Sequence, residues 1–399
     1  MTDVARPIVR LKPGVDPRPL RRGAPWAYAD QLVMDRRTRG LAPGALVGLQ
    51  DAERRPVGLA AFNPASKIAA RLLDPDPEIA VDRTWFAARL DRALRLRAVL
   101  YDAPFYRLVH AEADGLPGVV IDRFGDAAAI QPNAAWAEAR LDDLVAALVE
   151  ATGVATVVKN AGGRARALEG LDDAGGLLRG ALAGPVETPM NGATYLADLT
   201  GGQKTGLFFD QRENHAFAAR LARSRDVLDV FSHVGGFALA ALAAGARSAL
   251  AVDGSEPALA LAAGGAARSG VEARFATLRS DAFDAMAALA AEGRRFGLAI
   301  CDPPAFAPNR AALEAGLRAY ERVARLAAGL VEPGGFLVLC SCSHAADLAR
   351  FREASLRGIG RAGRAAQILH VGFAGPDHPV HPHLAETAYL KALFLRLGP

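Results

Sequence analysis

The stretch that decides the expected fold is Asp226-Val-Leu-Asp229-Val-Phe231-Ser-His-Val-Gly235-Gly236-Phe. An apolar run ends in a glycine-containing loop that opens a helix, an arrangement that parallel sheets place at their carboxyl edge, where ligands bind. The spacing departs from the G-x-G-x-x-G pattern that cradles a pyrophosphate, which disfavours a nicotinamide dinucleotide. Glycine at 235 and 236 still allows the backbone to approach a ligand closely.

The chain from about residue 194 onward alternates strands and helices, which is typical of a parallel sheet in a Rossmann-like α/β domain. The first four expected strands each lead into a helical stretch, a fifth strand follows them, and two final strands close the domain. These seven strands are expected at 227–230, 248–252, 273–277, 297–301, 336–340, 367–371 and 389–397.

Two smaller regions precede this domain. Residues 1–73 alternate short β-like runs with Pro and Gly turns, the pattern of a small β-barrel or sandwich. After the Asp-Pro-Asp-Pro break at 74–77, helices are expected at 82–100 and 134–150 with strands around them, which predicts an α+β region. We therefore expect three domains, at 1–73, 78–190 and 191–399.

Acidic residues follow the first three strands of the expected parallel sheet. Asp253 ends the second strand, about twenty residues after the glycine loop, and Asp281 follows the third. An adenosyl group offers ribose hydroxyls and an exocyclic amine, both donors that carboxylates satisfy. Either acid alone reads as a loop or cap residue, but the set favours a cofactor site. Its expected residues are Asp229, Phe231, Gly235, Gly236, Asp253, Asp281 and Asp302.

The segment Ile300-Cys-Asp302-Pro-Pro-Ala-Phe306 follows the fourth expected strand. Paired prolines restrict the backbone and present Asp302 with little freedom. A rigid carboxyl at the sheet edge can hydrogen-bond a nucleobase edge, for example the exocyclic amine of cytosine. Phe306 can stack on a flipped base, although packing in the core is the commoner fate of such a residue.

The segment Leu339-Cys340-Ser-Cys342-Ser343 carries a candidate nucleophile. Carbon 5 of a pyrimidine is a poor nucleophile until a thiolate adds to carbon 6, which lets carbon 5 attack a sulfonium methyl before a base removes its proton. Cys342 lies just past a strand end and beside Asp302 if neighbouring strands are arranged as usual, whereas Cys340 reads as a buried strand residue. An inert, buried side chain is the general alternative for a lone cysteine.

Polar residues outside these segments suggest contacts with RNA. In the segment 202–214, Asp210 and Glu213 resemble a helix capping box. That role leaves Gln203, Lys204 and Arg212 for phosphate or carboxylate contacts. Of the three histidines 378, 381 and 383, the neighbouring prolines disfavour a metal site, and His378 is expected in a loop that lines the active site without a metal.

The bulk composition is that of a globular protein, with 51% hydrophobic and 23% charged residues. Residues 1–40 contain nine basic and four acidic side chains, including Arg21 and Arg22, although the whole chain carries a net charge of only +4. Such a basic segment suits a phosphate backbone, and equally a solvated surface. No apolar stretch is long enough to span a bilayer, and three cysteines indicate no disulfide framework, so a reducing cytoplasm is expected.

These segments together resemble bacterial large-subunit (23S) rRNA cytosine-C5 methyltransferases that carry an N-terminal PUA domain. The resemblance implies a PUA domain, a central α+β domain and a class I methyltransferase domain that uses S-adenosylmethionine. It also implies a cytosine of large-subunit rRNA as the target and Cys342 as the nucleophile. The matching stretches run in order along nearly the whole chain, at 21–26, 114–126, 202–214, 235–237, 302–304, 341–343 and 377–380.

The chain departs from the family pattern at three positions. His233 stands where a hydroxyl-bearing aromatic is usual, Ala305 where a lysine often follows the prolines, and Ala24 where a histidine often precedes Pro25. The absence of the lysine bears on the RNA contacts and therefore on the target nucleotide.

Other functions remain open from the residues. One alternative is an enzyme of the same fold that methylates a ring or exocyclic nitrogen. Such an enzyme needs no cysteine, so the Ser-Cys-Ser sequence argues against this alternative. A non-catalytic RNA-binding or ribosome assembly factor is a second alternative, and a small-molecule methyltransferase a third. A homodimer through the β-rich module is a further expectation that no particular residue supports.

Overall fold

A computed structural model describes residues 6–201 and 206–398. The chain forms two compact units. The first comprises Met1–Gly184, Leu199–Thr205 and Pro379–Ala385, and the second comprises Pro185–Asp198, Gly206–His378 and Glu386–Pro399. None of the helices in the described parts is both long and apolar enough to cross a membrane.

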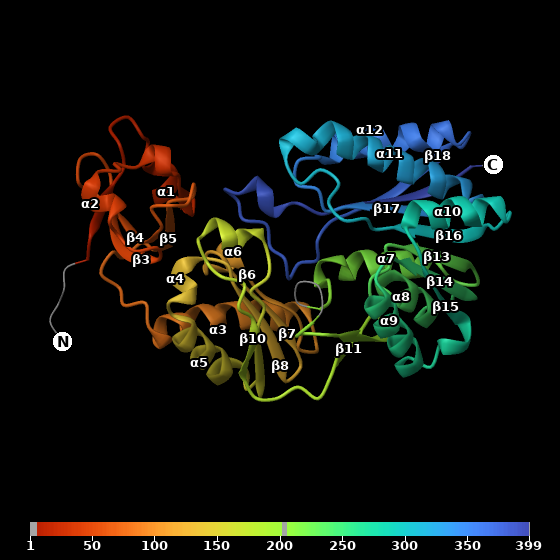
Figure 1. Cartoon of the computed structure of the whole chain (residues 1–399), viewed down its shortest axis with the longest axis horizontal. Coiled ribbons are helices and arrows are strands. Elements are labelled where there is room, and N and C mark those ends of the chain that lie inside the picture. The colour runs from red at the N-terminus through yellow and green to blue at the C-terminus, as the bar shows by residue number, and fades with distance from the viewer. Residues whose placement is uncertain (1–5, 202–205, 399) are drawn as a thin grey trace. The chain divides into compact units, whose positions relative to one another are not determined.

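The N-terminal part of the first unit is a β-rich module built on one five-stranded sheet (Figure 1). Alternating apolar residues of its strands, such as Val9, Val47 and Phe62, are fully buried and form the core of the module. The strands, in spatial order, are β1 (Ile8–Arg10), β3 (Ala45–Gln50), β4 (Pro56–Phe62), β5 (Ala70–Asp74) and β2 (Trp26–Ala27), with short helices α1 (Arg18–Arg21), η1 (Ala29–Gln31) and α2 (Arg36–Arg39).

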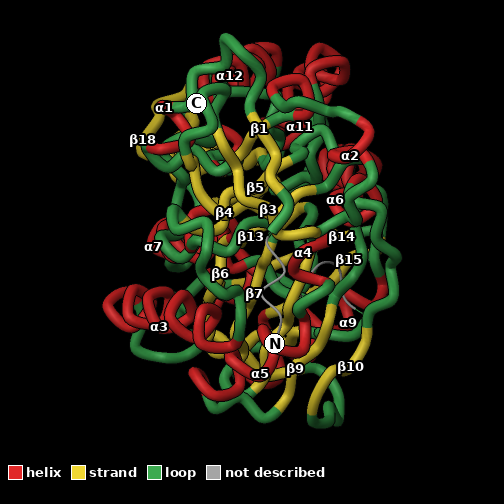
Figure 2. The backbone as a smooth tube through the Cα atoms, turned by 90° about the vertical axis from the view of Figure 1, so that its left-hand side faces the viewer, coloured by secondary structure: helices red, strands yellow, loops and turns green. Residues whose placement is uncertain are grey.

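The middle domain packs two long helices, α3 (Arg83–Leu100) and α5 (Leu141–Thr152), side by side next to a second sheet (Figure 2). Asp82 caps α3 by accepting a hydrogen bond from the Trp85 backbone N–H. The sheet, in spatial order, contains β10 (Gly176–Arg179), β9 (Thr156–Lys159), β8 (Ala127–Pro132), β7 (Val119–Phe124) and β6 (Phe105–His110). Short helices η2 (Ala111–Asp114), α4 (Ala135–Glu138) and α6 (Arg164–Leu168) complete the domain.

The expectation of a single helix at 134–150 is wrong. Arg140 has φ −125° and ψ 24°, outside the helical region, and separates α4 from α5. The apolar pattern of the two helices continues across this break, so periodicity alone does not reveal it.

The second unit contains a seven-stranded sheet that confirms the expected Rossmann-like α/β domain. All neighbouring strands are parallel except where β19 pairs antiparallel with β17 and β18. The spatial order is β15 (Phe275–Arg279), β14 (Ser248–Asp253), β13 (Asp226–Val230), β16 (Phe296–Cys301), β17 (Val331–Ser341), β19 (Lys391–Leu397) and β18 (Ala366–Gly372).

Helices cover both faces of this sheet (Figure 1). One face carries α7 (Arg212–Leu221), α8 (Gly236–Ala243) and α9 (Glu256–Arg268), and the other carries α10 (Ala282–Ala291), α11 (Leu313–Gly329) and α12 (Leu348–Arg361). A two-stranded hairpin, β11 (Val186–Met190) and β12 (Ala193–Ala197), packs against α8 and α9. The remaining short helices are η3 (Phe209–Gln211), η4 (Glu272–Arg274), η5 (Arg310–Ala312) and η6 (Ala385–Thr387).

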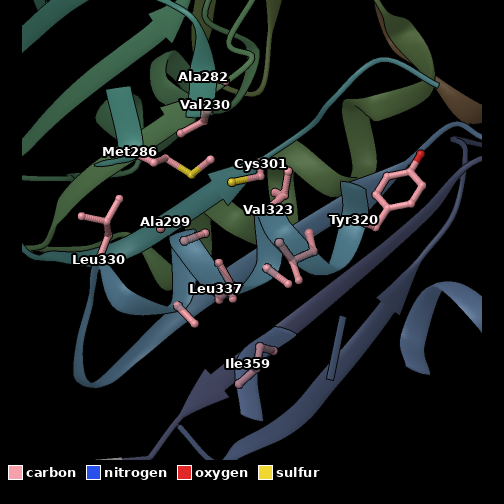
Figure 3. Close-up of a cluster of buried hydrophobic side chains, with 14 of the residues drawn as sticks. Val230, Ala282, Met286, Ala299, Cys301, Tyr320, Val323, Leu330, Leu337 and Ile359 are labelled. Carbon is pink, nitrogen blue, oxygen red and sulfur yellow. The ribbon is translucent and has the colours of Figure 1, made fainter. Parts of the chain in front are cut away.

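The core of the second unit lies between the sheet and α10–α12 (Figure 3). Because the central strands are buried on both faces, they read as continuous apolar runs, and every residue of β16 is buried. The ring of Tyr320 lies at one end of the cluster, and its hydroxyl points away from the apolar side chains (Figure 3). That end of the core is where the candidate site begins.

Candidate functional site

The loop that follows β13 has an unusual backbone. Phe231 and His233 have φ of 62° and 50°, and Gly235 has φ of 79°, so three of five consecutive residues are left-handed. The two non-glycine residues each cost free energy on the order of 1 kcal/mol, a strain that proteins retain chiefly at functional sites. The loop is held by β14, because Ser232 donates its backbone N–H to Val252 and His233 donates to a carboxylate oxygen of Asp253 at 2.9 Å.

Asp253 and Asp281 both have structural partners. The second oxygen of Asp253 accepts from the Ser255 backbone N–H at 2.8 Å. Asp281 caps α10 by accepting from the backbone N–H groups of Phe283 and Asp284. Asp253 and Asp281 therefore stabilise a loop and a helix N-terminus, as expected if each is an ordinary loop or cap residue. Their contact with a cofactor stays a prediction.

Asp229 lies fully buried at the end of β13. One carboxyl oxygen accepts from the Ala238 backbone N–H at 2.9 Å, and the other has no hydrogen-bond partner among the described residues. Burial, together with the nearby charges of Asp302 and Asp253, raises the pKa of Asp229 to about 8. At neutral pH the group is therefore mostly protonated and can donate as well as accept.

A small cavity of about 60 Å³ opens beside this loop. Two buried polar atoms at its wall, Ser232 Oγ and His215 Nδ1, have no hydrogen-bond partner among the described residues. Burial lowers the pKa of His215 to about 3, so its ring is neutral and Nδ1 can accept or donate. The cavity is lined by Leu207, Phe208, Gln211, His215, Phe231, Ser232, His233, Val234, Gly236, Phe237 and Asp302.

The pair of glycines at the start of α8 allows the ring of His215 to pack closely against the helix backbone. A Cβ atom at Gly236 would lie 2.7 Å from the ring of His215, which is too close for any side chain. His215 in turn packs edge-on against Phe237, with ring centroids 4.4 Å apart. Neither His215 nor Ser232 was among the predicted site residues; both lie within or near quoted segments, but only folding places them at one cavity.

Asp302 follows β16, and its backbone N–H donates to Val230 at 3.2 Å. The side-chain amide of Gln211 donates to Asp302 Oδ2 at 2.8 Å, while Gln211 Oε1 accepts from Asn214 at 2.6 Å. Gln211 therefore orients the carboxyl that the sequence singled out. This role was missed because Gln211 and Asp302 are 91 residues apart in the chain.

Cys342 lies directly after β17, which neighbours β16. Its sulfur is half-buried and 4.0 Å from the carbonyl oxygen of Pro303, so it lies against the Asp302-Pro-Pro loop. Cys301 and Cys340 are fully enclosed, and burial raises the pKa of both thiols. The expectations that Cys342 lies beside the acid-Pro-Pro loop and that Cys340 is buried are confirmed; the nucleophilic role of Cys342 remains a prediction.

A hydroxyl network holds the Cys342 loop in place. Ser341 Oγ donates to the Tyr320 hydroxyl at 2.9 Å, and that hydroxyl shares a 2.6 Å hydrogen bond with Ser343 Oγ. Ser343 Oγ also accepts from the Ala307 backbone N–H at 2.9 Å. The network thus ties the cysteine loop to the loop that begins at Asp302.

Lys391, at the start of β19, also stabilises the loop that carries Cys342. Its buried ammonium donates to the backbone carbonyls of Ser343 at 2.6 Å and Ala346 at 2.7 Å. Burial lowers the pKa of Lys391 to about 8, against the opposing influence of Cys342 and Asp347. Because β19 comes late in the chain and enters the sheet out of order, no local sequence pattern pointed to Lys391 or Tyr320.

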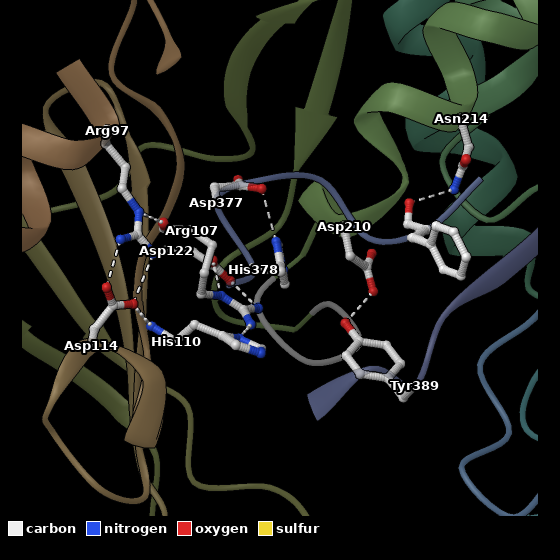
Figure 4. A network of polar contacts seen from close by, with 11 residues as sticks. Arg97, Arg107, His110, Asp114, Asp122, Asp210, Asn214, Asp377, His378 and Tyr389 are labelled. Atoms are coloured by element: carbon white, nitrogen blue, oxygen red, sulfur yellow. Dashed lines mark hydrogen bonds and ion pairs between the residues drawn. The ribbon is translucent and has the colours of Figure 1, made fainter. Parts of the chain in front are cut away.

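The described residues that were predicted to contact RNA are divided between the two units. In the first unit, Arg21 donates to Asp51 at 2.8 Å and Arg22 is exposed. In the second unit, Arg212 is buried with its guanidinium over Phe209, Phe306 packs 5.0 Å from the ring of Tyr320, and His378 shares a 2.9 Å hydrogen bond with Asp377 (Figure 4). Gln203 and Lys204 lie outside the described residues.

The proposed capping box at Asp210 and Glu213 is wrong. The N-cap of α7 is Gln211, and no side chain caps the helix. Asp210 instead accepts a hydrogen bond from the hydroxyl of Tyr389 at 2.6 Å (Figure 4). That contact joins residues 179 apart, so a local motif explained a side chain whose partner is distant.

Comparison with protein families gives two matches. Residues 146–396 match the S-adenosylmethionine-dependent methyltransferase family, and residues 9–75 match the PUA-like domain. The chain belongs to the S-adenosylmethionine-dependent methyltransferase family. The methyltransferase match includes the glycine loop, the Asp302-Pro-Pro loop and Cys342, and it begins within the middle domain.

Curated relatives of this methyltransferase align over nearly its whole length. It is 34% identical to "Ribosomal RNA large subunit methyltransferase I" of Shewanella denitrificans, over 98% of this chain and 99% of the relative. It is 35% identical to "Ribosomal RNA large subunit methyltransferase" of Deinococcus radiodurans, over 95% and 94% of the two chains. A putative methyltransferase, SMU.776, solved in complex with SAH shares the fold, with a TM-score of 0.81 and 20% identity over 98% of this chain and 99% of that one.

Proposed function

We propose that this enzyme methylates carbon 5 of a cytosine in large-subunit rRNA. The observation that carries the proposal is the position of the Cys342 sulfur, 4.0 Å from the carbonyl of Pro303, beside the loop that presents Asp302. Relatives at 33–35% identity are named as methyltransferases of large-subunit ribosomal RNA, which supports the same substrate class for this chain. Transfer to a ring nitrogen would need neither the thiol nor its position.

The cavity beside the β13 loop suits part of an S-adenosylmethionine molecule. The unpartnered Ser232 Oγ and His215 Nδ1 would hydrogen-bond polar groups of the cofactor. Asp253 and Asp281, at the ends of β14 and β15, would receive the ribose and adenine donors. The cavity volume, about 60 Å³, is smaller than a typical ligand site of roughly 300–1,000 Å³, so most of the cofactor would lie outside the cavity, along the ends of these strands.

When bound, the cofactor supplies an electrophilic methyl group on a sulfonium. The Cys342 thiolate adds to carbon 6 of cytosine, forming a sulfur–carbon bond and moving the carbon 5–carbon 6 π electrons toward carbon 5. Carbon 5 then attacks the sulfonium methyl group, whose bond to sulfur breaks with its electron pair remaining on the sulfur. A base removes the carbon 5 proton, and the electrons of that C–H bond restore the double bond and expel the Cys342 thiolate.

Asp302 holds the target base during these steps. Its carboxyl, oriented by Gln211, would accept a hydrogen bond from the exocyclic amine of cytosine. A uracil has a carbonyl at that position, so two acceptors would face each other and binding would be lost. This arrangement therefore accounts for selection of cytosine over uracil.

The test is mass-spectrometric mapping of modified nucleotides in rRNA from cells that lack this protein. The proposal predicts the loss of one 5-methylcytosine from the large-subunit rRNA and its return when the wild-type gene is restored. Restoring a Cys342→Ala variant should leave the nucleotide unmethylated, whereas a Cys340→Ala variant should methylate it. Loss of a methyl group from a nitrogen, or an unchanged profile, would refute the cytosine-C5 assignment.

A further inference from the structure

A second, larger cavity lies within the first unit, where the β-rich module meets the middle domain. Its volume is about 510 Å³, within the range of cavities that hold small ligands, and most of its surface is apolar. All of its lining residues belong to the first unit. The cavity is lined by Trp26, Ala65, Ser66, Lys67, Ile68, Arg71, Ala111, Glu112, Gly118, Val120, Asn133, Ala165, Leu168 and Glu169.

One wall of the cavity is a planar aromatic and guanidinium pair. Trp26 of β2 and Arg71 of β5 are direct cross-strand partners, and the Arg71 guanidinium lies 5.8 Å from the centre of the Trp26 ring. Glu112 fixes both, because its Oε1 accepts from the Trp26 indole N–H at 2.9 Å and from Arg71 at 3.1 Å. The wall is therefore rigid before any ligand arrives.

The same wall carries hydrogen-bonding capacity. Arg71 also donates to Glu169 at 3.0 Å, yet its buried Nε–H has no hydrogen-bond partner among the described residues. A buried donor without an acceptor is unfavourable unless a ligand or water satisfies it. Two carboxylates, those of Glu112 and Glu169, face the single guanidinium of Arg71. They can therefore accept further hydrogen bonds from an amino group.

The mouth of the cavity combines apolar and basic side chains. Leu168 at the end of α6 is 62% exposed, a high value for a leucine, and Lys67, which also lines the cavity, is exposed as well. A flat, uncharged ring with amino and carbonyl groups on its edge would suit the interior, and an anionic backbone would suit the lysine at the mouth.

We infer that this cavity binds an unstacked nucleobase of the RNA substrate, stacked on Trp26 with its edge toward Arg71 and Glu112. The inference rests on the proposed function for the nature of the substrate, but it concerns a site in the other unit. It gives the PUA-like module and the middle domain a shared role in RNA recognition. One captured base would fix the register of the strand without taking part in the reaction.

Binding of a short, fluorescein-labelled single-stranded RNA of mixed sequence, followed by fluorescence anisotropy, tests the inference. Leu168→Glu places a negative charge at the mouth, and its matched control is Val99→Glu, at a position in the same unit that is 84% exposed and does not line the cavity. Leu168→Glu should weaken binding at least fivefold, and Trp26→Leu by about 5- to 150-fold, as expected for losing one base–aromatic stack. Val99→Glu should bind like the wild type.

A photochemical experiment locates the contact independently. RNA containing 4-thiouridine should cross-link on irradiation to peptides that contain Trp26 or Leu168. If cross-links fall only elsewhere and Leu168→Glu binds as tightly as Val99→Glu, the inference is overturned. Assaying methylation of rRNA by the same preparations separates the two proposals: methylation with no effect at the cavity refutes the inference alone, and cavity-dependent binding without methylation refutes the proposed function alone.

Discussion

The carboxyl of Asp229 is enclosed at the end of β13, where burial and two neighbouring carboxyls raise its pKa to about 8. An unfolded aspartate has a pKa of 3.8, so the folded protein keeps a proton that the unfolded chain releases. The stabilising effect of this proton is complete below pH 4 and is lost as the pH rises toward 8. A single buried side chain at the end of β13 thus makes the fold less stable as the pH rises from about 4 to about 8.

Asp229→Asn should remove that sensitivity, because asparagine can still accept from Ala238 but cannot ionise. Urea titrations would give the free energy of unfolding of each protein. The difference between the variant and the wild type should increase in favour of the variant from pH 5 to pH 8, by at most about 1.4 kcal/mol per pH unit. The exposed variant Asp142→Asn serves as the control and should run parallel to the wild type. Parallel curves for Asp229→Asn would show that Asp229 is ionised in the folded protein.

Two cysteines two residues apart allow a sharp comparison. Cys342→Ala should lower cytosine methylation by at least about 1,000-fold, because it removes the proposed nucleophile. Cys340→Ala, in which the thiol is buried, should stay within a few-fold of the wild type. Both should bind S-adenosylmethionine normally in calorimetric titrations. Equal loss in the two variants would point to a structural role instead.

The sequence located residues whose signal is local, and it missed those whose partners are distant. Asp302 and Cys342 follow apolar strands at adjacent positions of a parallel sheet, so their proximity could be predicted. Gln211 and Lys391 act through hydrogen bonds to residues 91 and 48 positions away, which no pattern in the chain encodes. The same reason explains why Asp210, which bonds distant Tyr389, was misread as part of a capping box.

At the scale of elements, the loop after β17 depends on side chains from two other elements, α11 and β19. Tyr320 contributes a hydroxyl from α11, and Lys391 contributes two hydrogen bonds from β19. These contacts hold the backbone that carries Cys342, without placing either side chain at the proposed reacting atoms. Both are therefore positioning residues.

Lys391→Met should lower kcat for RNA methylation by about 10- to 100-fold, because small displacements of a reacting group have effects of that size. Its affinity for S-adenosylmethionine, measured by calorimetry, should not change. Arg364→Met is the matched control, since Arg364 also donates to backbone carbonyls of this domain, those of Ala328, Val331 and Gly398. If both variants lose the same activity, the effect of Lys391 is general destabilisation.

The central strands β13 and β16 of the parallel sheet were predictable because their burial on both faces leaves continuous apolar runs. Others were not. The break at Arg140 interrupts no apolar pattern. The hairpin β11–β12 directly follows a stretch that is rich in glycine and alanine. Their positions follow from packing against other elements rather than from local composition.

At the scale of the whole molecule, the net positive charge is concentrated near the N-terminus. Residues 1–40 hold nine of the basic and four of the acidic side chains, and Arg36, Arg37 and Arg39 of α2 are exposed. Contacts between such side chains and phosphates release counterions, which makes binding steeply dependent on salt.

Replacing Arg36, Arg37 and Arg39 together by Glu should therefore weaken RNA binding and flatten its dependence on salt concentration. Each lost phosphate contact should lower the log–log slope by about 0.7 to 0.9. The matched control replaces the exposed Arg83, Arg92 and Arg95 of α3, which changes the net charge equally. If both triple variants behave alike, net charge rather than the position of the basic residues governs binding.

Domain organisation was predictable only in part. The boundary expected at the Asp-Pro-Asp-Pro segment stays a prediction, and the PUA-like family match covers residues 9–75. The contacts nevertheless group the β-rich module with the middle domain in one unit, to which residues 379–385 also belong. The composition of residues 379–385 does not indicate that this segment belongs to the first unit.

The most direct test of the proposed chemistry uses an rRNA fragment that contains 5-fluorocytidine at the target position, incubated with the enzyme and S-adenosylmethionine. Fluorine at carbon 5 cannot leave as a proton does, so the bond between the enzyme and carbon 6 should persist. We predict a covalent RNA–protein adduct that mass spectrometry assigns to Cys342, and none with Cys342→Ala. Methylation of the unsubstituted fragment without any adduct on its fluorinated counterpart, or an adduct at another residue, would contradict the proposed mechanism.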